Sequence, residues 1–140
     1  MPVLTDDLGF LLSRASGLVV RGTNAALAAD GLRVRQYSVL VLACDARGGV
    51  SQRDLARILG LDPSQIVQLV DELTASGLLE RRSSPADRRT KLIVATEKGR
   101  MAREEAAGHA AAALRESLHA LSAAERETLR VLLRRVVLAP

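Results

Sequence analysis

The part of the chain that decides the fold is residues 51–95, which read SQRDLARILGLDPSQIVQLVDELTASGLLERRSSPADRRTKLIVA. A start that resembles a capping box at Ser51 opens a short helix, and a glycine turn follows it. Asp62 and Pro63 then begin a second helix, because aspartate is a good N-cap and proline fits the first helical position. We expect this helix to end near Ser76. Helix, glycine turn and capped helix form the pattern of a helix-turn-helix.

A β-hairpin is predicted directly after this pattern. Residues 78–82 indicate a strand, residues 83–87 a turn, and residues 88–95 a returning strand. A hairpin in this place makes the predicted motif a winged helix. Its basic side chains suit a phosphate backbone and the adjoining minor groove. They are Arg81, Arg82, Arg88, Arg89 and Lys91, with the acidic residues Glu80 and Asp87 among them.

The second helix of the motif has two different faces. Its buried side is aliphatic, whereas its opposite, N-terminal part carries Ser64, Gln65 and Gln68. Hydroxyl and amide groups can hydrogen-bond base edges, so we predict that these side chains lie in the major groove. Ser51 and Gln52, at the start of the preceding helix, complete the predicted DNA contacts. Solvated residues of any two-helix segment would show the same polar side chains, so the hairpin decides between the two interpretations.

Further helices are predicted on both sides of the winged helix. Apolar residues recur every three or four positions in residues 5–29 and predict a helix with one apolar face. Residues 34–46 are apolar over most of their length and predict a buried central helix. Residues 96–119 predict an alanine-rich helix, and Ser122 begins a capping box for a last helix to about residue 138. The fold class is therefore mainly α with a small β-wing.

We predict one domain over residues 1–140, with a DNA-binding lobe at 30–98 and dimerisation helices at 1–29 and 99–140. The terminal helices offer more apolar surface than a small winged helix can cover, which would be a liability in a monomer. A homodimer is expected for this reason. The residues expected in its interface are aliphatic: Leu8, Leu11, Leu12, Leu129, Leu132, Leu133, Val136 and Val137.

Composition excludes several classes of function. The chain has 140 residues, a formal net charge of +4, 48% hydrophobic residues and 1% aromatic residues. The apolar content excludes a disordered tail, and the shortage of aromatics excludes binding of single strands by base stacking. No common catalytic or metal-binding pattern is present, so we expect no enzyme activity, no cofactor and no metal site. The sequence has no signal segment or membrane-length apolar run, which predicts a cytoplasmic protein.

The segment 87–99, DRRTKLIVATEKG, resembles the wing signature D-x-R-x-x-x-[VI]-x-L-T-x-x-G of the multiple antibiotic resistance regulator (MarR) family. Ala95 is the one departure, since the family usually has leucine there. Residues 61–64 and 70–81 also resemble the family's recognition helix and its exit, and the resemblance extends over essentially the whole chain. It implies a homodimeric repressor of transcription that binds a palindromic double-stranded operator with half-sites about 10 base pairs apart, or a multiple of that.

The resemblance also implies roles for individual residues. In the family, the arginine at the position of Arg89 reaches the minor groove, and the aspartate at the position of Asp87 holds the wing tip. Many members bind small aromatic or phenolic anions between the dimer helices and the DNA-binding lobe. With so few aromatic residues, we expect a small polar anion or an aliphatic effector, or none. The effector contacts predicted from helix position are Arg14, Arg21, Tyr37, Cys44 and His109.

Three alternatives stay open at this point. Other members of the family sense oxidants through a cysteine, so Cys44 could make the protein redox-responsive. A small buried filler is the favoured explanation for a lone cysteine on an apolar face, because nothing in the local sequence supplies the exposure and positive charge that a reactive thiol needs. A winged helix can also serve as a protein-interaction module without DNA binding. An enzyme assembled in the dimer cleft would need acid and base groups that converge only in three dimensions.

Overall fold

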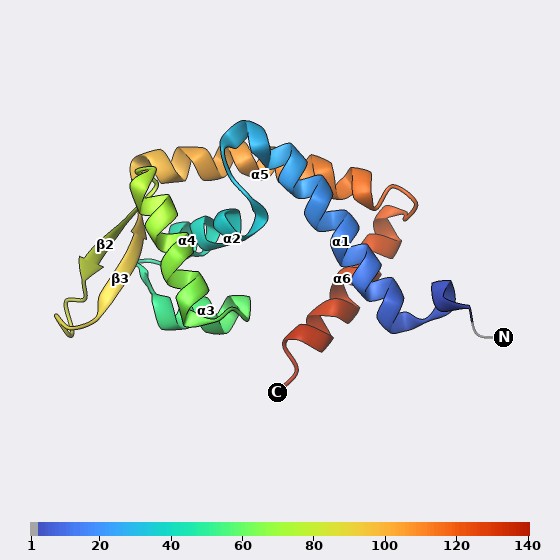
Figure 1. Cartoon of the computed structure of the whole chain (residues 1–140), viewed down its shortest axis with the longest axis horizontal. Helices are drawn as coiled ribbons and strands as arrows, with labels where there is room; N and C mark the ends of the chain where they lie inside the picture. Colours follow the sequence, from blue (N-terminus) through green and yellow to red (C-terminus); the bar gives the residue numbers. More distant parts are fainter. Residues whose placement is uncertain (1–2) are drawn as a thin grey trace.

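The computed structural model describes residues 3–140, and its elements follow in the predicted order (Figure 1). Helices α2, α3 and α4 and the β-hairpin form a lobe at one end, and α5 runs from this lobe to α1 and α6 at the other end. The helices are α1 (Leu8–Leu27), α2 (Val34–Asp45), α3 (Gln52–Leu59), α4 (Pro63–Ala75), α5 (Glu97–Ser117) and α6 (Ala123–Val137). The strands are β1 (Val50–Ser51), β2 (Leu79–Ser83) and β3 (Lys91–Ala95).

The first helix is shorter than predicted at both ends. It begins at Leu8 because the Asp7 carboxylate accepts a hydrogen bond from the Phe10 N–H at 2.9 Å and caps the first turn. At the other end a short 3-10 turn follows, and Gly31 adopts the left-handed conformation at φ 70°. The prediction of one continuous helix over residues 5–29 was therefore wrong by a few residues at each end.

The helix-turn-helix has the predicted caps. Ser51 Oγ accepts a hydrogen bond from the Asp54 N–H at 3.0 Å at the start of α3. Gly60 ends this helix in the left-handed region, at φ 65°. Asp62 is the N-cap of α4 and Pro63 its first residue, so the two helices are joined by a short turn.

The wing belongs to a three-stranded antiparallel sheet with the order β1-β3-β2. Leu79 pairs with Ala95 and Ser83 with Lys91, while the short strand β1 pairs with the other edge of β3. The returning strand was predicted from residue 88 but begins at Lys91. Residues 88–90 form a turn instead, because the Asp87 side chain accepts the Arg89 N–H at 3.0 Å and bends the chain locally.

The junction between the wing and α5 depends on a close backbone approach. Thr96 Oγ1 accepts the Gly99 N–H at 3.0 Å and donates to the Gly77 carbonyl at 2.6 Å. A Cβ atom on Gly99 would lie 2.1 Å from the carbonyl oxygen of Leu78. Only glycine therefore fits at position 99 without a shift of the backbone, which gives the last residue of the wing signature a physical reason.

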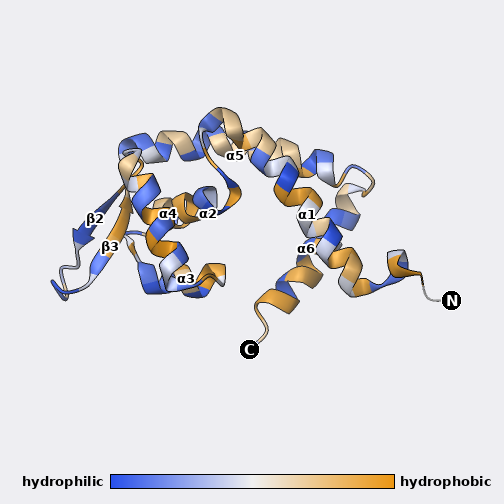
Figure 2. Cartoon of the chain, viewed as in Figure 1, coloured by the Kyte–Doolittle hydropathy of each residue, from blue (hydrophilic) through white to orange (hydrophobic). Residues whose placement is uncertain are grey.

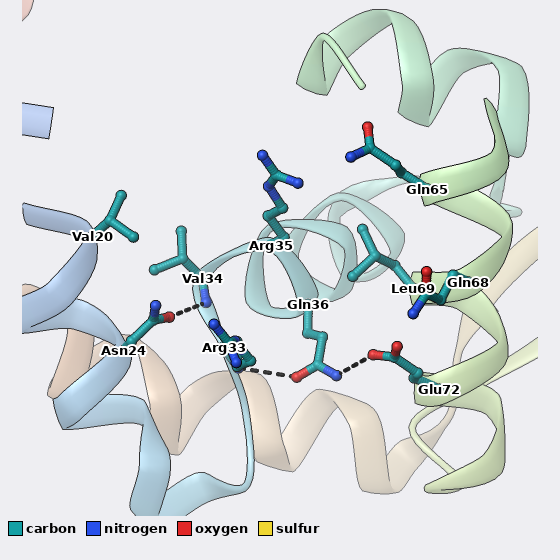
Figure 3. Close-up of a pocket in the computed structure, with 10 residues that line it drawn as sticks. All are labelled: Val20, Asn24, Arg33, Val34, Arg35, Gln36, Gln65, Gln68, Leu69 and Glu72. Atoms are coloured by element: carbon teal, nitrogen blue, oxygen red, sulfur yellow. Dashed lines mark hydrogen bonds between the residues drawn. The ribbon is translucent and has the colours of Figure 1, made fainter. Parts of the chain in front are cut away.

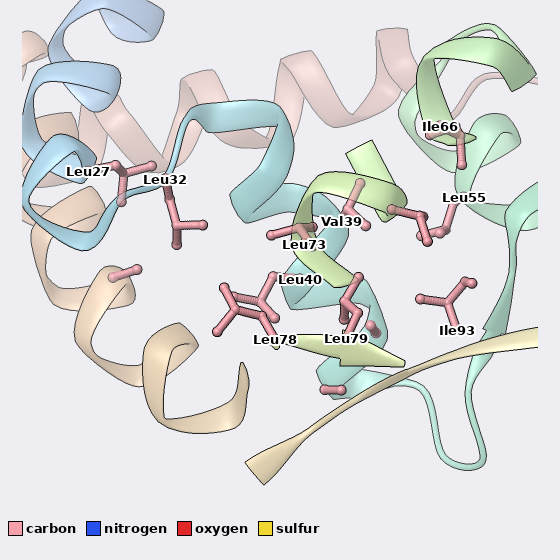
Figure 4. Close-up of a cluster of buried hydrophobic side chains, with 14 residues drawn as sticks. Leu27, Leu32, Val39, Leu40, Leu55, Ile66, Leu73, Leu78, Leu79 and Ile93 are labelled. Atoms are coloured by element: carbon pink, nitrogen blue, oxygen red, sulfur yellow. The ribbon is translucent and has the colours of Figure 1, made fainter. Parts of the chain in front are cut away.

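The hydrophobic core lies in the lobe (Figure 4). It joins the inner faces of α2, α3 and α4 to the sheet, to the end of α1 and to the middle of α5. Its members are aliphatic: Leu27, Leu32, Val39, Leu40, Ala43, Leu55, Ile66, Val70, Leu73, Leu78, Leu79, Ile93, Ala95 and Ala106.

The helices outside the lobe carry large apolar side chains that are exposed in the single chain. Figure 2 shows hydrophobic residues along both α1 and α6. Helix α6 has no buried residue among those described, and α1 buries only Thr23 and Leu27. In α6 the exposed fraction is 50% for Leu132 and 74% for Val136. Seven of the eight residues predicted in the dimer interface are exposed, and Leu129 is half-buried. Within residues 3–140, no helix is both long enough and apolar enough to cross a membrane.

Candidate nucleic-acid interface

Helix α4 presents one exposed face to the outside of the lobe. Its exposed residues beyond the first turn recur at positions 67, 68, 71 and 75, and Ser64 extends the same face toward the N-terminus. The opposite face supplies Ile66, Val70 and Leu73 to the core. Because the core fixes one side of the helix, the other side is held in a defined orientation toward solvent.

The amide groups predicted to read bases differ in their surroundings. Gln68 is exposed, whereas Gln65 is half-buried and its Oε1 accepts the Asp62 N–H at 3.1 Å. The Gln65 side chain therefore stabilises the first turn of α4 and keeps only its NH₂ group for another partner. Ser51 is committed to the cap of α3, and Gln52 Oε1 accepts a hydrogen bond from Arg81 at 3.4 Å.

The wing holds its basic side chains in two different ways. Arg82 forms an ion pair with Glu80, and Lys91 Nζ donates to Ser83 Oγ at 2.8 Å across the hairpin. Arg88 and Arg89 are exposed at the tip, and no acidic side chain among residues 3–140 forms an ion pair with either of them. These two guanidinium groups are therefore available to an external anion.

The tip itself is closed by hydrogen bonds around Asp87. Its side chain accepts the Arg89 N–H at 3.0 Å, and its carbonyl accepts the Thr90 N–H at 3.0 Å. The Ser84 N–H donates to the Thr90 carbonyl at 2.8 Å and closes the base of the loop. This arrangement orders the backbone that carries Arg88 and Arg89, so their charges are presented from a defined turn.

Arg81 links three elements of the lobe. Its guanidinium lies 2.5 Å from Asp71 Oδ1 on α4 and 3.4 Å from Gln52 Oε1 at the start of α3. Arg81 is one of the residues predicted to contact DNA, and in this structure its guanidinium is paired with protein groups. The ion pair is partly exposed, so it contributes little to stability by itself, but it fixes the wing against α4.

A pocket of about 550 Å³ lies between α1, the start of α2 and the inner flank of α4 (Figure 3). Arg33 and Arg35 bring positive charge to it, and Glu72 brings one carboxylate. The remaining lining residues are amide and aliphatic side chains: Val20, Asn24, Val34, Gln36, Gln65, Gln68 and Leu69. The pocket thus shares Gln65 and Gln68 with the candidate interface.

A chain of hydrogen bonds crosses this pocket. The Arg33 N–H donates to Gln36 Oε1 at 3.0 Å, and Gln36 Nε2 donates to Glu72 Oε2 at 2.6 Å (Figure 3). Asn24 Oδ1 accepts the Val34 N–H at 2.9 Å from the side of α1. The pocket therefore connects α1, α2 and α4 directly, and a ligand bound in it would contact the helix that carries the candidate base readers.

The residues predicted as effector contacts lie elsewhere in the described chain. Arg14 and Arg21 are exposed on α1, and Tyr37 packs against the core. His109 Nδ1 lies 2.7 Å from Asp30 Oδ2, whose side chain is only 6% exposed, and this pair joins α5 to the turn before α2. The structure does not bring these residues together with Cys44 into one site, and none of them lines the pocket described above.

Cys44 is half-buried, and its surroundings do not activate it. Burial raises the pKa of the Cys44 thiol, and the nearby Arg103 and Arg100 only partly oppose this effect. A raised pKa leaves less thiolate, which is the reactive form. This favours a packing role for Cys44 over the redox hypothesis.

Sequence reasoning missed the pocket arginines, although a signal was present. Arg33 and Arg35 lie at the start of α2, where the helix dipole disfavours positive charge. Basic residues at such a position are unfavourable without an acidic partner, and this pattern could have suggested an anion site.

Among residues 3–140, no group of three or more histidine, cysteine or acidic side chains is placed to hold a metal ion.

Comparison with known proteins identifies close relatives. The sequence pattern of the MarR family matches residues 30–90. CouR from Rhodococcus jostii RHA1, solved with p-coumaroyl-CoA, is 47% identical, with a TM-score of 0.92 over all of this chain and 98% of its own. A MarR-family transcriptional regulator from Rhodococcus sp. RHA1 is 46% identical, with a TM-score of 0.94 over all of this chain and 99% of its own. A transcriptional repressor, CouR, bound to a 23-mer DNA duplex, is 32% identical, with a TM-score of 0.86 over 95% of this chain and 94% of its own.

Proposed function

The chain belongs to the MarR family of transcriptional regulators, and from this premise we propose how its residues bind DNA and respond to an effector. It is a DNA-binding regulator rather than an enzyme. The observation that carries the proposal is the exposed face of α4 beside a wing tip whose two arginines are free for an external anion. We place the protein in the cytoplasm, where it would meet the DNA that it regulates.

The functional unit is a homodimer on a palindromic operator. Helices α1 and α6 leave aliphatic side chains exposed that a second copy of the chain would cover. A two-fold dimer places two lobes side by side, so each lobe reads one half-site, with the half-sites about 10 base pairs apart or a multiple of that. In this division, residues 30–98 bind DNA and the flanking helices hold the copies together.

In each half-site, α4 lies in the major groove and the wing tip in the adjoining minor groove. Ser64 and Gln68 lie near base edges, and the free NH₂ group of Gln65 donates from the flank. Arg88 and Arg89 contact phosphates and the minor groove. Arg82 and Lys91 contact phosphates, while Ser51, Gln52 and Arg81 hold α3, α4 and the wing in position for this contact.

Arg89→Ala is expected to cost about 1–3 kcal/mol of DNA affinity and to lower the salt dependence of binding by about one counterion. The operator is first found by selection from random duplex DNA with the wild-type protein. Titrations at several salt concentrations then give the affinity and the salt slope of each variant.

Arg130→Ala is the matched control for this measurement. Arg130 is an exposed arginine on α6, paired with Glu127 at 2.6 Å and distant in sequence from the wing. It should keep both the affinity and the salt slope of the wild type. If selection yields no preferred sequence, or if both variants bind like the wild type with the same slope, the proposed wing contact is wrong.

The pocket between α1, α2 and α4 is the effector site that we propose. Arg33 and Arg35 suit an anionic ligand, and CouR from Rhodococcus jostii RHA1, which is 47% identical, is solved with p-coumaroyl-CoA. We therefore assign an acyl-CoA thioester as the class of effector. Because Gln65 and Gln68 line the pocket and also belong to the DNA-reading helix, bound ligand and bound DNA compete for the same flank of α4.

The Arg33→Ala, Arg35→Ala double variant should need about 10-fold or more effector for release from DNA, because each charge-assisted hydrogen bond contributes about 1.5–3 kcal/mol. Release by p-coumaroyl-CoA, free CoA and free p-coumarate is followed by fluorescence anisotropy of labelled operator. Arg21→Ala, which removes an exposed arginine of α1 outside the pocket, should respond like the wild type. Loss of response in Arg21→Ala alone would place the effector on α1 instead.

A further inference from the structure

The side of α4 that is proposed to face DNA carries one exposed aliphatic residue. The proposed contacts of DNA bases with amide and arginine side chains give this residue no role. Val67 is 40% exposed. Within Pro63–Ala75, all of which the structure describes, it is the only large hydrophobic residue on the exposed side. It precedes Gln68 directly, follows Ser64 by one turn and precedes Asp71 by one turn.

Packing inside the chain does not account for this side chain. The core contacts of α4 come from Ile66, Val70 and Leu73, which are buried, and Leu69 packs against that core from the pocket side. Val67 is not among the residues that line the pocket. Its isopropyl group therefore lies outside both apolar environments of the helix.

The position of Val67 relative to the wing is fixed. Asp71, one turn further along the same flank, forms its 2.5 Å ion pair with Arg81 of β2. Val67 therefore lies on the wing-facing flank of α4, whereas Gln65 and Glu72 lie on the flank that faces the pocket. A base pair that meets Val67 would lie on the wing side of the half-site.

Duplex DNA offers one apolar group on its base edges in the major groove, the C5 methyl group of thymine. We propose that Val67 is a specificity-determining residue that contacts a thymine methyl in each half-site, next to a base pair read by Gln68. Since glutamine pairs best with adenine, the expected half-site contains a thymine close to a Gln68-bound adenine. This inference rests on the proposed function, because it needs the operator that the wild-type protein selects.

The test replaces each thymine of the selected half-site by deoxyuridine, which removes only the methyl group. One position in each half-site should lower wild-type affinity by about 3- to 10-fold, as expected for losing one buried methyl contact per lobe. The same replacement should change the affinity of Val67→Ala by less than about two-fold, so the two changes are coupled in a double-mutant cycle. Val67→Ile should keep the sensitivity to deoxyuridine.

Two controls separate this contact from folding and from general hydrophobic effects. Val67→Thr keeps the shape of the side chain and one of its two methyl groups, so it should retain part of the deoxyuridine effect while circular dichroism shows an unchanged fold. Ile58→Ala removes an aliphatic side chain of α3 that is 49% exposed, and it should keep the full deoxyuridine effect. Equal deoxyuridine effects in the wild type and Val67→Ala at every thymine would overturn the inference. Failure to select any operator would instead overturn the proposed function.

Discussion

The Leu132→Asp, Val136→Asp double variant is expected to be a monomer with operator affinity lowered by about 100-fold or more. Both side chains are exposed in the single chain, on the apolar face of α6 that a second copy would cover. Two aspartates would have to be buried without partners, which prevents association. Without a linked second lobe, each half-site is bound independently, and the gain from effective concentration, about 100-fold or more, is lost. Sedimentation gives the mass, and operator titration gives the affinity.

Arg134→Asp is the control that isolates the interface. It changes the net charge by the same two units as the double variant, but it lies on the other side of α6 from Leu132 and Val136. It should remain dimeric and bind the operator within a few-fold of the wild type. Circular dichroism must show that both variants keep their helices. A double variant that is still dimeric would mean that α6 is not the contact between copies.

Gly99→Ala is expected to lower the free energy of unfolding by about 3 kcal/mol and the Tm by on the order of 10 °C. The added methyl group would meet the Leu78 carbonyl oxygen at 2.1 Å and the Leu40 side chain at 3.3 Å. The carbonyl cannot move freely, because it accepts the Thr96 N–H at 3.1 Å. The strain would therefore open the junction of the wing and α5.

Gly108→Ala provides a comparison within the same helix. A Cβ atom at this position meets no described atom within 4 Å, and alanine favours a helix by about 0.8–1.0 kcal/mol over glycine. Thermal unfolding at one fixed protein concentration should show an unchanged or higher Tm for Gly108→Ala and a much lower one for Gly99→Ala. Equal changes in the two variants would contradict the role given to the Leu78 contact.

The starts of α3 and α6 were predictable because each depends on a local hydrogen bond. Ser51 and Ser122 cap their helices by accepting an N–H three residues later, and both predictions are confirmed. The start of the returning strand was less predictable. The predicted strand began at residue 88, directly after the expected turn, whereas the Asp87 side chain bends the chain over residues 88–90. The pairing of β1 with β3 was also missed, since contacts between distant segments leave no periodic signal.

Part of the candidate site could likewise be predicted from the sequence, and part of it could not. Its exposed face on α4 followed from helical periodicity, because the aliphatic residues of that helix fix the opposite side. The pocket could not be predicted, since its lining comes from α1, α2 and α4, and no local pattern shows that Arg33 and Glu72 line the same pocket. For the same reason, a sequence cannot show that Arg81 is paired with Asp71. Whether a basic residue faces DNA or a neighbouring carboxylate depends on the tertiary fold.

Helix α5 connects the DNA-binding lobe to the helices at the other end of the chain. One end is joined to the wing through Gly99, and α1 packs along the helix on the way to α6. Its 21 residues span about 30 Å, so a tilt of about 5° at the dimer end displaces the wing by about 3 Å. That displacement is close to the rise of one base pair, about 3.4 Å. A tilt of this size at the far end of α5 would therefore change the distance between the two wings of a dimer by an amount comparable with one base-pair step.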